Sequence, residues 1–575
     1  MKKIIYILIV LVGFSACEED FLDPKYTNDL DLDQVLDDPA KVEAILLKAY
    51  EGIPSVQDNY GGFLDCATQN AVTNVTSTTL NRTVANAWLA ETNPLDRWLS
   101  SYASIQSINT FIEIGLRGDI IWKRSNDEDN ERIAERLEGE AYFLRGYHYF
   151  ELLKRFAGVD DSGVLMGVPI ITNSLSSDDV PALSRNTYQE VIDFIVDDLE
   201  YASQYLPEEY TGDTDAVLGV SQLGRATSVA CDALLSRVLL YAGSELNNSA
   251  DAITLNQEAA RAAARAIDVF GTLPDVYNAA GGNYDAYFNS GQDQETIMRR
   301  VSGNSNALEG INFPPSLFGN GRTNPTQNLV DAFPMADGYP IDHASSSYDP
   351  TLPYENRDNR FYMTVLYNGA FMKSHVVETF NGGVDTPSGT DGVANNTNST
   401  RTGYYLRKWL SGEADRNPAN WVTALHYFTV IRKGEVYLNF AEAANEAFGP
   451  DSDPFGVGLT AVDAIREVRR RAGINQPDLY LDEVASDQDA LRELIKNERR
   501  VELCFEGHYF YDIRRWNEDL NEPVMGMEIE EDEFGVAQYT PFEIHVPQYQ
   551  SHMTYGPMPY NEVIKTPSIS QNSGW

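Results

Sequence analysis

The chain has 575 residues, of which 43% are hydrophobic and 11% aromatic, so it can bury a sizeable core and does not have the composition of a disordered protein. Its 86 acidic residues outnumber its 43 lysines and arginines, and the formal net charge of −43 argues against nucleic acid as a ligand. The four cysteines form no CxxC pair and no metal-ligand spacing, so neither a disulfide framework nor a metal site is predicted.

The first seventeen residues have the layout of a bacterial lipoprotein signal. Lys2 and Lys3 precede an apolar run, Ile4 to Val12, which is too short to span a bilayer and has the length of a signal h-region. The run ends in Phe14-Ser15-Ala16-Cys17, which resembles a lipobox. We therefore expect residues 1–16 to be removed as a signal peptide and Cys17 to carry the lipid anchor. The alternative is an ordinary secretory signal with a chance cysteine.

Helical periodicity begins soon after this signal. Asp38-Pro39 has the cap-then-proline arrangement that predicts a short helix over Ala40 to Tyr50. Thr187 and Glu190 are spaced like a capping box at the start of a helix predicted over Thr187 to Tyr205. The remaining helices predicted in this half are Trp98 to Leu116, 131–156, Ala226 to Ala242 and Asn256 to Phe270.

Three helices are predicted near the C-terminal end, at Lys433 to Phe448, Leu459 to Ala472 and Asp487 to Phe505. Antiparallel pairs of this size resemble tetratricopeptide units, although no strict repeat period is visible. The sequence therefore predicts a mostly α fold of tetratricopeptide-like helix pairs, with the helical repeats mainly in 98–270 and 433–516.

Glycine, proline, asparagine, serine and threonine are frequent between the helical segments, at 51–97, 271–430 and 517–575, where helical periodicity fades. We interpret these ranges as loop-rich insertions, and the tail from Leu520 to Trp575 as irregular, within one domain that spans 17–575. Loops that a rigid scaffold positions are the usual place for a binding site. The ligand is therefore expected in this part of the chain.

One stretch near the C-terminal end indicates a particular protein family, which the helical pattern alone does not. Asn497 to Leu503, Phe505 to His508 and Tyr511 to Trp516 are close to the most characteristic stretch of the SusD/RagB family. Pro557 to Glu562, with Gln571 to Trp575, resembles the C-terminus of that family. Further resemblances, in chain order, are Phe21 to Asp23 after Cys17, Glu140 to Phe150, Asp197 to Ala202 and Glu435 to Ala443.

This resemblance implies four tetratricopeptide-like helix pairs and a loop-rich, ligand-binding face. It also implies a lipid-anchored location on the outer face of the outer membrane, as a lid over a SusC-like TonB-dependent transporter. Members capture oligosaccharides, or peptides in the RagB branch, for import. Glu18-Glu19-Asp20 resembles the signal that sends Bacteroidetes lipoproteins to the cell surface.

The charged residues of the motif lie mostly three or four positions apart, which favours an ion-pair network that holds the last helix to its neighbours. The alternative is an acid–base pair of His508 and Asp512, which would require a suitable geometry. The network residues are Glu498, Arg499, Arg500, Glu502, Glu506, Asp512, Arg514 and Arg515.

A sugar site needs an exposed aromatic ring among short polar side chains. Trp88 lies in such a context, whereas Trp98 begins a helical stripe and is predicted to be core. The alternative for Trp88 is a core residue that anchors its loop. The polar residues upstream of Trp88 are Asp65, Asn70, Asn74 and Arg82, and a second group of candidates is Tyr284, Arg401 and Tyr404.

No HExxH, GxSxG or P-loop motif is present, and 86 acidic residues make carboxylate pairs uninformative. We therefore predict no catalytic residues, no cofactor and no metal. The function expected is capture of an oligosaccharide or polysaccharide, with a neutral glycan favoured by the acidity of the chain. A peptide-binding RagB-like protein and a surface glycoside hydrolase are the alternatives.

Overall fold

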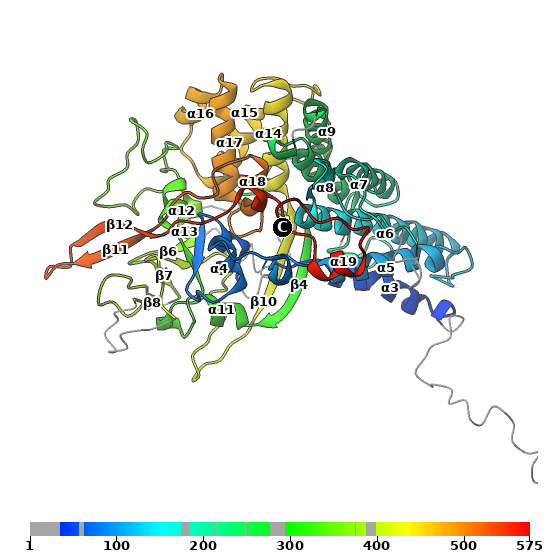
Figure 1. Ribbon diagram of the computed structural model, residues 1–575, viewed down its shortest axis with the longest axis horizontal. Helices are drawn as coiled ribbons and strands as arrows, with labels where there is room; N and C mark the ends of the chain where they lie inside the picture. Colours follow the sequence, from blue (N-terminus) through cyan, green and yellow to red (C-terminus); the bar gives the residue numbers. More distant parts are fainter. Residues whose placement is uncertain are drawn as a thin grey trace, which may run out of the picture.

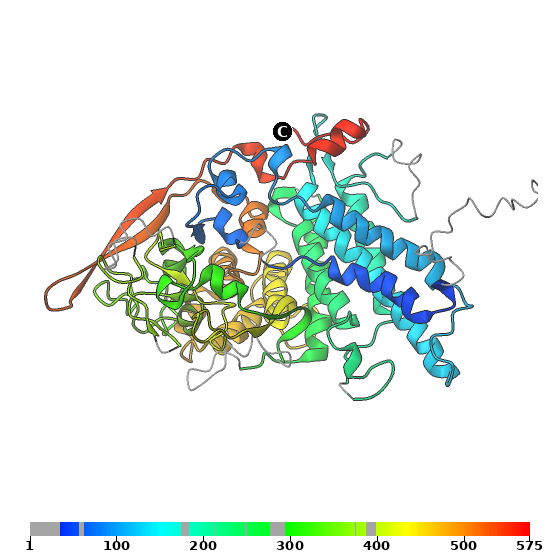
Figure 2. The same cartoon turned by 90° about the horizontal axis from the view of Figure 1, so that it is seen from below.

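The computed structural model describes residues 35–56, 62–173, 183–211, 213–247, 250–275, 294–373, 375–386 and 398–575. Helices gather in one half of the molecule, and loops with short two-stranded sheets form the other half (Figures 1 and 2). The mostly α fold predicted from the sequence is confirmed.

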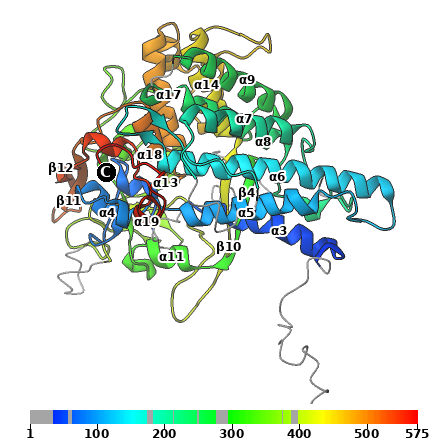
Figure 3. The same ribbon diagram turned by 45° about the vertical axis from the view of Figure 1, so that its right-hand side comes forward.

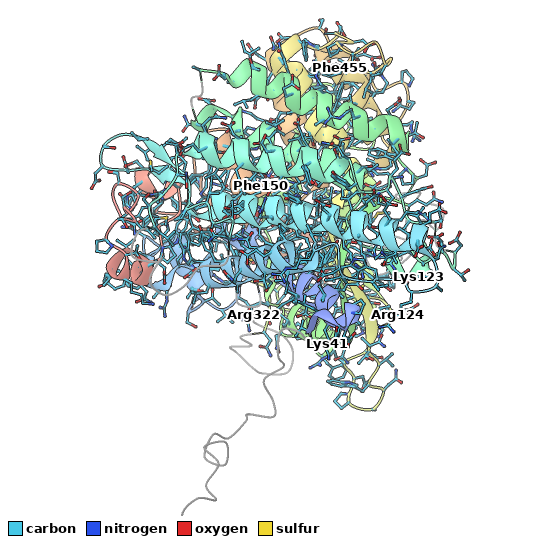
Figure 4. The ribbon with its side chains drawn as sticks, turned by 90° about the vertical axis from the view of Figure 1, so that its right-hand side faces the viewer. Lys41, Lys123, Arg124, Phe150, Arg322 and Phe455 are labelled. Carbon is cyan, nitrogen blue, oxygen red and sulfur yellow. The ribbon has the colours of Figure 1, made fainter. Side chains whose placement is uncertain are left out.

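The predicted helices are present, with small shifts at their ends. In chain order they are α3 (Pro39–Glu51), α5 (Trp98–Gly115), α6 (Asp127–Phe156), α7 (Tyr188–Ser203), α8 (Ser228–Ala242), α9 (Ala252–Phe270), α14 (Lys433–Phe448), α15 (Ala461–Ala472) and α17 (Gln488–Glu502). α16 (Leu479–Val484) and α18 (Tyr509–Arg515) flank α17. α3 packs against α5, each helix from α5 to α9 packs against the next, and α14 continues the series against α9 (Figures 3 and 4). α8 pairs with α9 and α14 with α15, as predicted.

Local capping explains why these helices start where they do. The Asp38 side chain accepts a hydrogen bond from the Ala40 backbone N–H, and Pro39 occupies the first helical position of α3. Thr187 and Glu190 form the predicted capping box of α7, so two backbone N–H groups that the helix cannot pair are satisfied.

The loop-rich insertion returns to the helices through a long antiparallel ribbon, in which β4 (Thr296–Ser305) pairs with β10 (Ala424–Arg432). At its end, Arg237 of α8 forms a buried, bidentate ion pair with Glu435 of α14 and donates to the Val430 carbonyl. This arrangement brings α9 and α14 together although the insertion separates them in the sequence.

The tail is more regular than predicted. β11 (Val524–Glu531) and β12 (Ala537–His545) form an antiparallel hairpin that projects from the loop-rich half (Figure 1). The Asp532 carboxylate accepts from the backbone N–H groups of Phe534 and Val536, and Gly535 takes a positive φ in the turn. The prediction that residues 520–575 are irregular is therefore wrong for the hairpin, because its many exposed glutamates hide the strand pattern.

The remaining elements are short. The helices are α4 (Thr79–Val84), α11 (Ala307–Asn312), α12 (Gln327–Ala332), α13 (Asn359–Thr364) and α19 (Tyr560–Lys565). The strands are β1 (Ala71–Thr73), β2 (Gly158–Val159), β3 (Leu165–Met166), β5 (Thr323–Pro325), β6 (Val365–Leu366), β7 (Phe371–Met372), β8 (His375–Val376) and β9 (Tyr405–Leu406). The sheets are β1–β5, β2–β3, β6–β9 and β7–β8.

The predicted ion-pair network exists, but most of its partners come from distant segments. Glu502 binds Arg360, Arg432 and Arg471 in the interior. Burial alone would raise the pKa of the Glu502 carboxyl, but these three guanidinium groups hold it well below its usual range. The network thus joins α17 to α13, β10 and α15, and its partners are not mainly residues three or four positions away.

Two members of the predicted network do not take part in it. Arg500 donates to the Asn70 side chain, and Arg514 stacks over the Phe510 ring. Within the described chain, neither forms an ion pair. Each guanidinium is stabilised by aromatic or amide contacts, which the spacing of charges in the sequence does not reveal.

The acid–base alternative finds no support in the geometry of the motif. His508 is buried, and its burial together with the cations of Arg237 and Arg499 lowers its pKa well below the ordinary value. Asp512 instead forms an ion pair with Arg515. Both side chains belong to the core.

Candidate ligand-binding site

A cavity of about 590 Å³ opens in the loop-rich half, beside the β11–β12 hairpin, and we call it the hairpin cavity. Its volume lies in the range of pockets that hold small molecules. The lining residues are Asn74, Thr379, Asn381, Thr386, Ser399, Thr400, Arg401, Gly403, Met527, Glu528, Ile529, Phe542, Glu543 and Ile544.

The hairpin forms one wall. Phe542 of β12 lies directly opposite Gly526 of β11, and the ring passes over the place that a side chain at position 526 would occupy. The Phe542 side chain is 38% exposed, so it keeps an accessible face at the cavity. An aromatic face of this kind is what the C–H side of a sugar ring stacks against.

Backbone hydrogen bonds hold the facing loop to this wall. The Met527 N–H donates to the Thr402 carbonyl at 2.8 Å, and the Asn381 N–H donates to the Ile529 carbonyl at 2.8 Å. Both sides of the cavity are therefore fixed relative to each other before a ligand arrives, which lowers the entropic cost of binding.

Two hydrogen bonds hold Arg401 in place at the wall of the cavity. Its backbone N–H donates to Asn324 Oδ1 at 3.1 Å, and Nη1 donates to the Thr73 carbonyl at 3.1 Å. Burial lowers the pKa of the Arg401 guanidinium, but a guanidinium stays charged at neutral pH. In the described part of the chain no carboxylate forms an ion pair with it, so its other N–H groups are suited to ligand hydroxyls.

Short polar side chains complete the lining. The Asn381 side-chain amide donates to the Glu528 carboxylate at 3.0 Å. The Thr379 hydroxyl is buried at the cavity and has no hydrogen-bond partner among the residues that the structure describes. A buried hydroxyl without a partner is costly, and a ligand hydroxyl would satisfy it. The arrangement can bind a polyhydroxylated molecule, with one aromatic face and several hydrogen-bonding groups around it.

The family model described as the SusD family matches residues 283–575, which is more than half of the chain. The chain belongs to the SusD family. A second SusD-like model, described as starch-binding and associating with the outer membrane, matches residues 20–240. The family assignment made from the motif residues is therefore confirmed.

Relatives of the SusD family support this assignment. SusD-like protein P2 of Formosa agariphila is 25% identical over 427 residues, which are 73% of this chain and 70% of that protein. A SusD-like protein of Bacteroides fragilis has a similar fold, with a TM-score of 0.75, 24% identity and coverage of 95% and 99% of the two chains. A laminarin-binding SusD-like protein matches with a TM-score of 0.60, 20% identity and coverage of 93% and 99%. None of the helices in the described residues has the length and apolar character needed to span a bilayer.

Of the candidate residues named from the sequence, Arg401 lines the hairpin cavity, and so does Asn74, one of the polar residues upstream of Trp88. Tyr404 lies behind it in the core, where its hydroxyl donates to Gln327 Oε1 at 2.6 Å. Arg82 lies exposed in the last turn of α4 and does not line the cavity. Tyr284, like Cys17 at the predicted lipid site, lies outside the described residues.

Trp88, Asp65 and Asn70 have structural contacts in the interior. Trp88 is 2% exposed, its Nε1 donates to Asn93 Oδ1 at 2.9 Å, and its ring packs edge-on against Trp575. The alternative interpretation of Trp88, a core residue that anchors its loop, fits this geometry. Burial raises the pKa of Asp65, whose carboxylate accepts from Asn70 and from a backbone N–H of the motif loop.

Sequence reasoning missed Phe542, Asn381 and Thr379 because they lie in segments read as irregular. The available signal was the short alternation of apolar and acidic residues from Met527 to Glu530, which is typical of a strand, and the further acidic residues that follow it obscured the pattern.

Trp88→Ala tests whether this ring is core or ligand contact. We expect it to destabilise the folded chain by about 3–5 kcal/mol, because it removes a large buried ring and one of the two hydrogen bonds to the Asn93 amide oxygen, which also accepts from the Leu95 N–H. Thermal unfolding measures the loss, and calorimetry at a temperature where the variant is folded measures binding. Unchanged stability with lost glycan binding would contradict the core assignment.

Proposed function

We propose that this chain is a non-catalytic surface lipoprotein that captures a neutral glycan in the hairpin cavity and delivers it to a SusC-like TonB-dependent outer-membrane transporter. The observation that carries the proposal is the lining of the cavity, in which Phe542 offers an aromatic face beside hydroxyl, amide and guanidinium groups. This is the chemistry by which sugar rings and their hydroxyls are recognised.

Membership of the SusD family supports the outer-membrane association, because one matching family model is described in those terms. Solved relatives described as carbohydrate-binding and laminarin-binding support a glycan as the ligand. The lipobox-like sequence at Cys17 supports a lipid anchor. The transporter partner follows from the family resemblance.

A neutral glycan is favoured by the charges at the cavity. Glu528 and Glu543 line it together with one cation, Arg401, in a chain whose net charge is −43. A sulphated or uronic polymer would be repelled by these carboxylates and by the field of the whole protein. A neutral polymer meets no such penalty.

Calorimetric binding of the soluble form, residues 18–575, to a panel of neutral and acidic oligosaccharides tests this function. We expect one class of neutral glycan to bind with micromolar to millimolar affinity and to be recovered intact. Shortened products would contradict the non-catalytic assignment, tighter binding of acidic sugars would contradict neutrality, and binding of peptides alone would favour the RagB-like function.

A further inference from the structure

A second, smaller cavity of about 60 Å³ lies where the helical half meets the C-terminal segment. We call it the Arg514 cavity, and it shares no lining residue with the hairpin cavity. α6 contributes Phe150 and Lys154 to its lining, and Phe150 is labelled in Figure 4. α18 contributes Phe510, Tyr511, Arg514 and Arg515.

Arg514 is a buried cation with an unused hydrogen-bonding edge. Its side chain is 4% exposed, and its guanidinium carbon lies 3.5 Å from the centre of the Phe510 ring. Nη1 donates to the Phe510 carbonyl at 2.9 Å, whereas Nε and Nη2 have no hydrogen-bond partner among the described residues. Nε and Nη2 lie on the same edge of a guanidinium.

Elsewhere in this chain the same edge binds a carboxylate. Arg145 donates from Nε and Nη2 to the two oxygens of Asp198, at 2.8 and 2.7 Å. Such a fork matches the two oxygens of a carboxylate and is among the strongest hydrogen-bonding arrangements in proteins. In the described chain, no protein carboxylate is paired with Arg514.

The cavity therefore has one positive charge that no carboxylate in the described chain compensates, although the Phe510 and Tyr549 side chains contact the guanidinium. The two other cations at its wall are already paired, Lys154 with Glu151 and Arg515 with Glu442. Burial, with the nearby cations of Arg155 and Arg237, lowers the pKa of Lys154 to about 8 despite its ion pair. An uncompensated buried charge is costly, and an anion would remove that cost.

The other walls indicate what kind of anion would fit. The Tyr511 hydroxyl is buried and has no hydrogen-bond partner among the described residues, so it can add a third donor. Trp88, Phe510 and Tyr188 supply aromatic walls. A water molecule needs roughly 10–15 Å³ of such space, so the cavity holds only a ligand of a few heavy atoms.

We infer that the Arg514 cavity binds a small organic acid, whose carboxylate is held by the Nε and Nη2 edge of Arg514 and whose short apolar part packs on the aromatic walls. This site is independent of glycan capture. Occupancy would stabilise the junction between α6, α18 and the C-terminal segment, because a ligand that binds only the folded state raises its stability.

Calorimetry and thermal unfolding of residues 18–575 with propionate test the inference, with propionamide as the neutral analogue of the same size. We expect propionate, and not propionamide, to bind and to raise the melting temperature. In Arg514→Met the affinity for propionate should fall at least about tenfold, because the fork is lost. In Arg514→Lys it should fall less, since the charge remains.

Arg500→Met is the matched control, because Arg500 is another motif arginine that forms no ion pair in the described chain and does not line this cavity. We expect it to bind propionate as the parent chain does. Equal responses to propionate and propionamide would overturn the inference, as would binding of glucuronate in place of propionate. If Arg514→Met does not fold, a crystal structure of the parent chain with propionate decides: a carboxylate on Nε and Nη2 supports the site, and water alone overturns it.

Discussion

Replacing Glu502 with glutamine will destabilise the folded chain by about 3–5 kcal/mol, the cost typical of removing one partner from a buried ion pair. Glu502 binds Arg360, Arg432 and Arg471 deep in the interior, and glutamine leaves these guanidinium groups without its charge. Those arginines tie α13, β10 and α15 to α17, so the loss should loosen the junction between the two halves. Chemical or thermal unfolding measures it.

Glu518→Gln provides the matched control. Glu518 forms an ion pair with Lys496 at 2.6 Å, but its side chain is 43% exposed. Exposed pairs contribute about 0–1 kcal/mol, so we expect a small change. Equal losses of stability in the two variants would show that the buried ion pairs of Glu502 stabilise the fold no more than an exposed pair does.

Replacing Phe542 with alanine will lower the affinity for the glycan by about three- to sixfold. Fully burying a phenylalanine side chain contributes roughly 1.5–3 kcal/mol, and the 38% of Phe542 that is exposed leaves about 0.6–1.1 kcal/mol of this for a ligand to gain. Each 1.4 kcal/mol changes an affinity tenfold. Because 38% of the residue is exposed, its removal should cost less stability than the loss of a fully buried ring. Calorimetry with the oligosaccharide found in the panel measures the affinity.

Phe534→Ala is the control on the same hairpin. Phe534 lies in the turn, is 81% exposed and does not line the cavity. We expect it to bind glycan with unchanged affinity. An equal loss of glycan affinity in both variants would mean that the affinity depends on the hairpin as a whole and not on the Phe542 ring.

The helices were predictable because their signals are local. Asp38 with Pro39 and Thr187 with Glu190 lie within four residues of the backbone groups that they satisfy, so the sequence alone places these helix starts. The pairing of α8 with α9 was also predictable, because the two helices follow one another along the chain.

The strands and the partners of the network were not predictable in this way. β4 pairs with β10 across more than a hundred intervening residues, with irregular register at three places. Arg432 and Glu502 are separated by 70 positions, so their meeting depends on the packing of α14, α15 and α17. Long-range contacts of this kind leave no periodic trace in one sequence.

The site was predicted only in part, because the polarity of a loop does not determine which of its rings is buried. Trp88 stands among polar residues, yet one of them, Asn93, pairs with its indole N–H and allows it to be buried. Asp65 accepts from the Phe505 backbone N–H, 440 positions away. Arg401, predicted from the sequence as a ligand-binding residue, lines the hairpin cavity, and the structure adds the hairpin wall opposite it.

A crystal structure of residues 18–575 with the oligosaccharide selected by calorimetry tests whether the hairpin cavity holds the glycan. We expect a sugar ring stacked on Phe542, with its hydroxyls within hydrogen-bond distance of Arg401 and Asn381. A glycan bound on any surface that does not include these residues would show that the hairpin cavity is not the glycan-binding site.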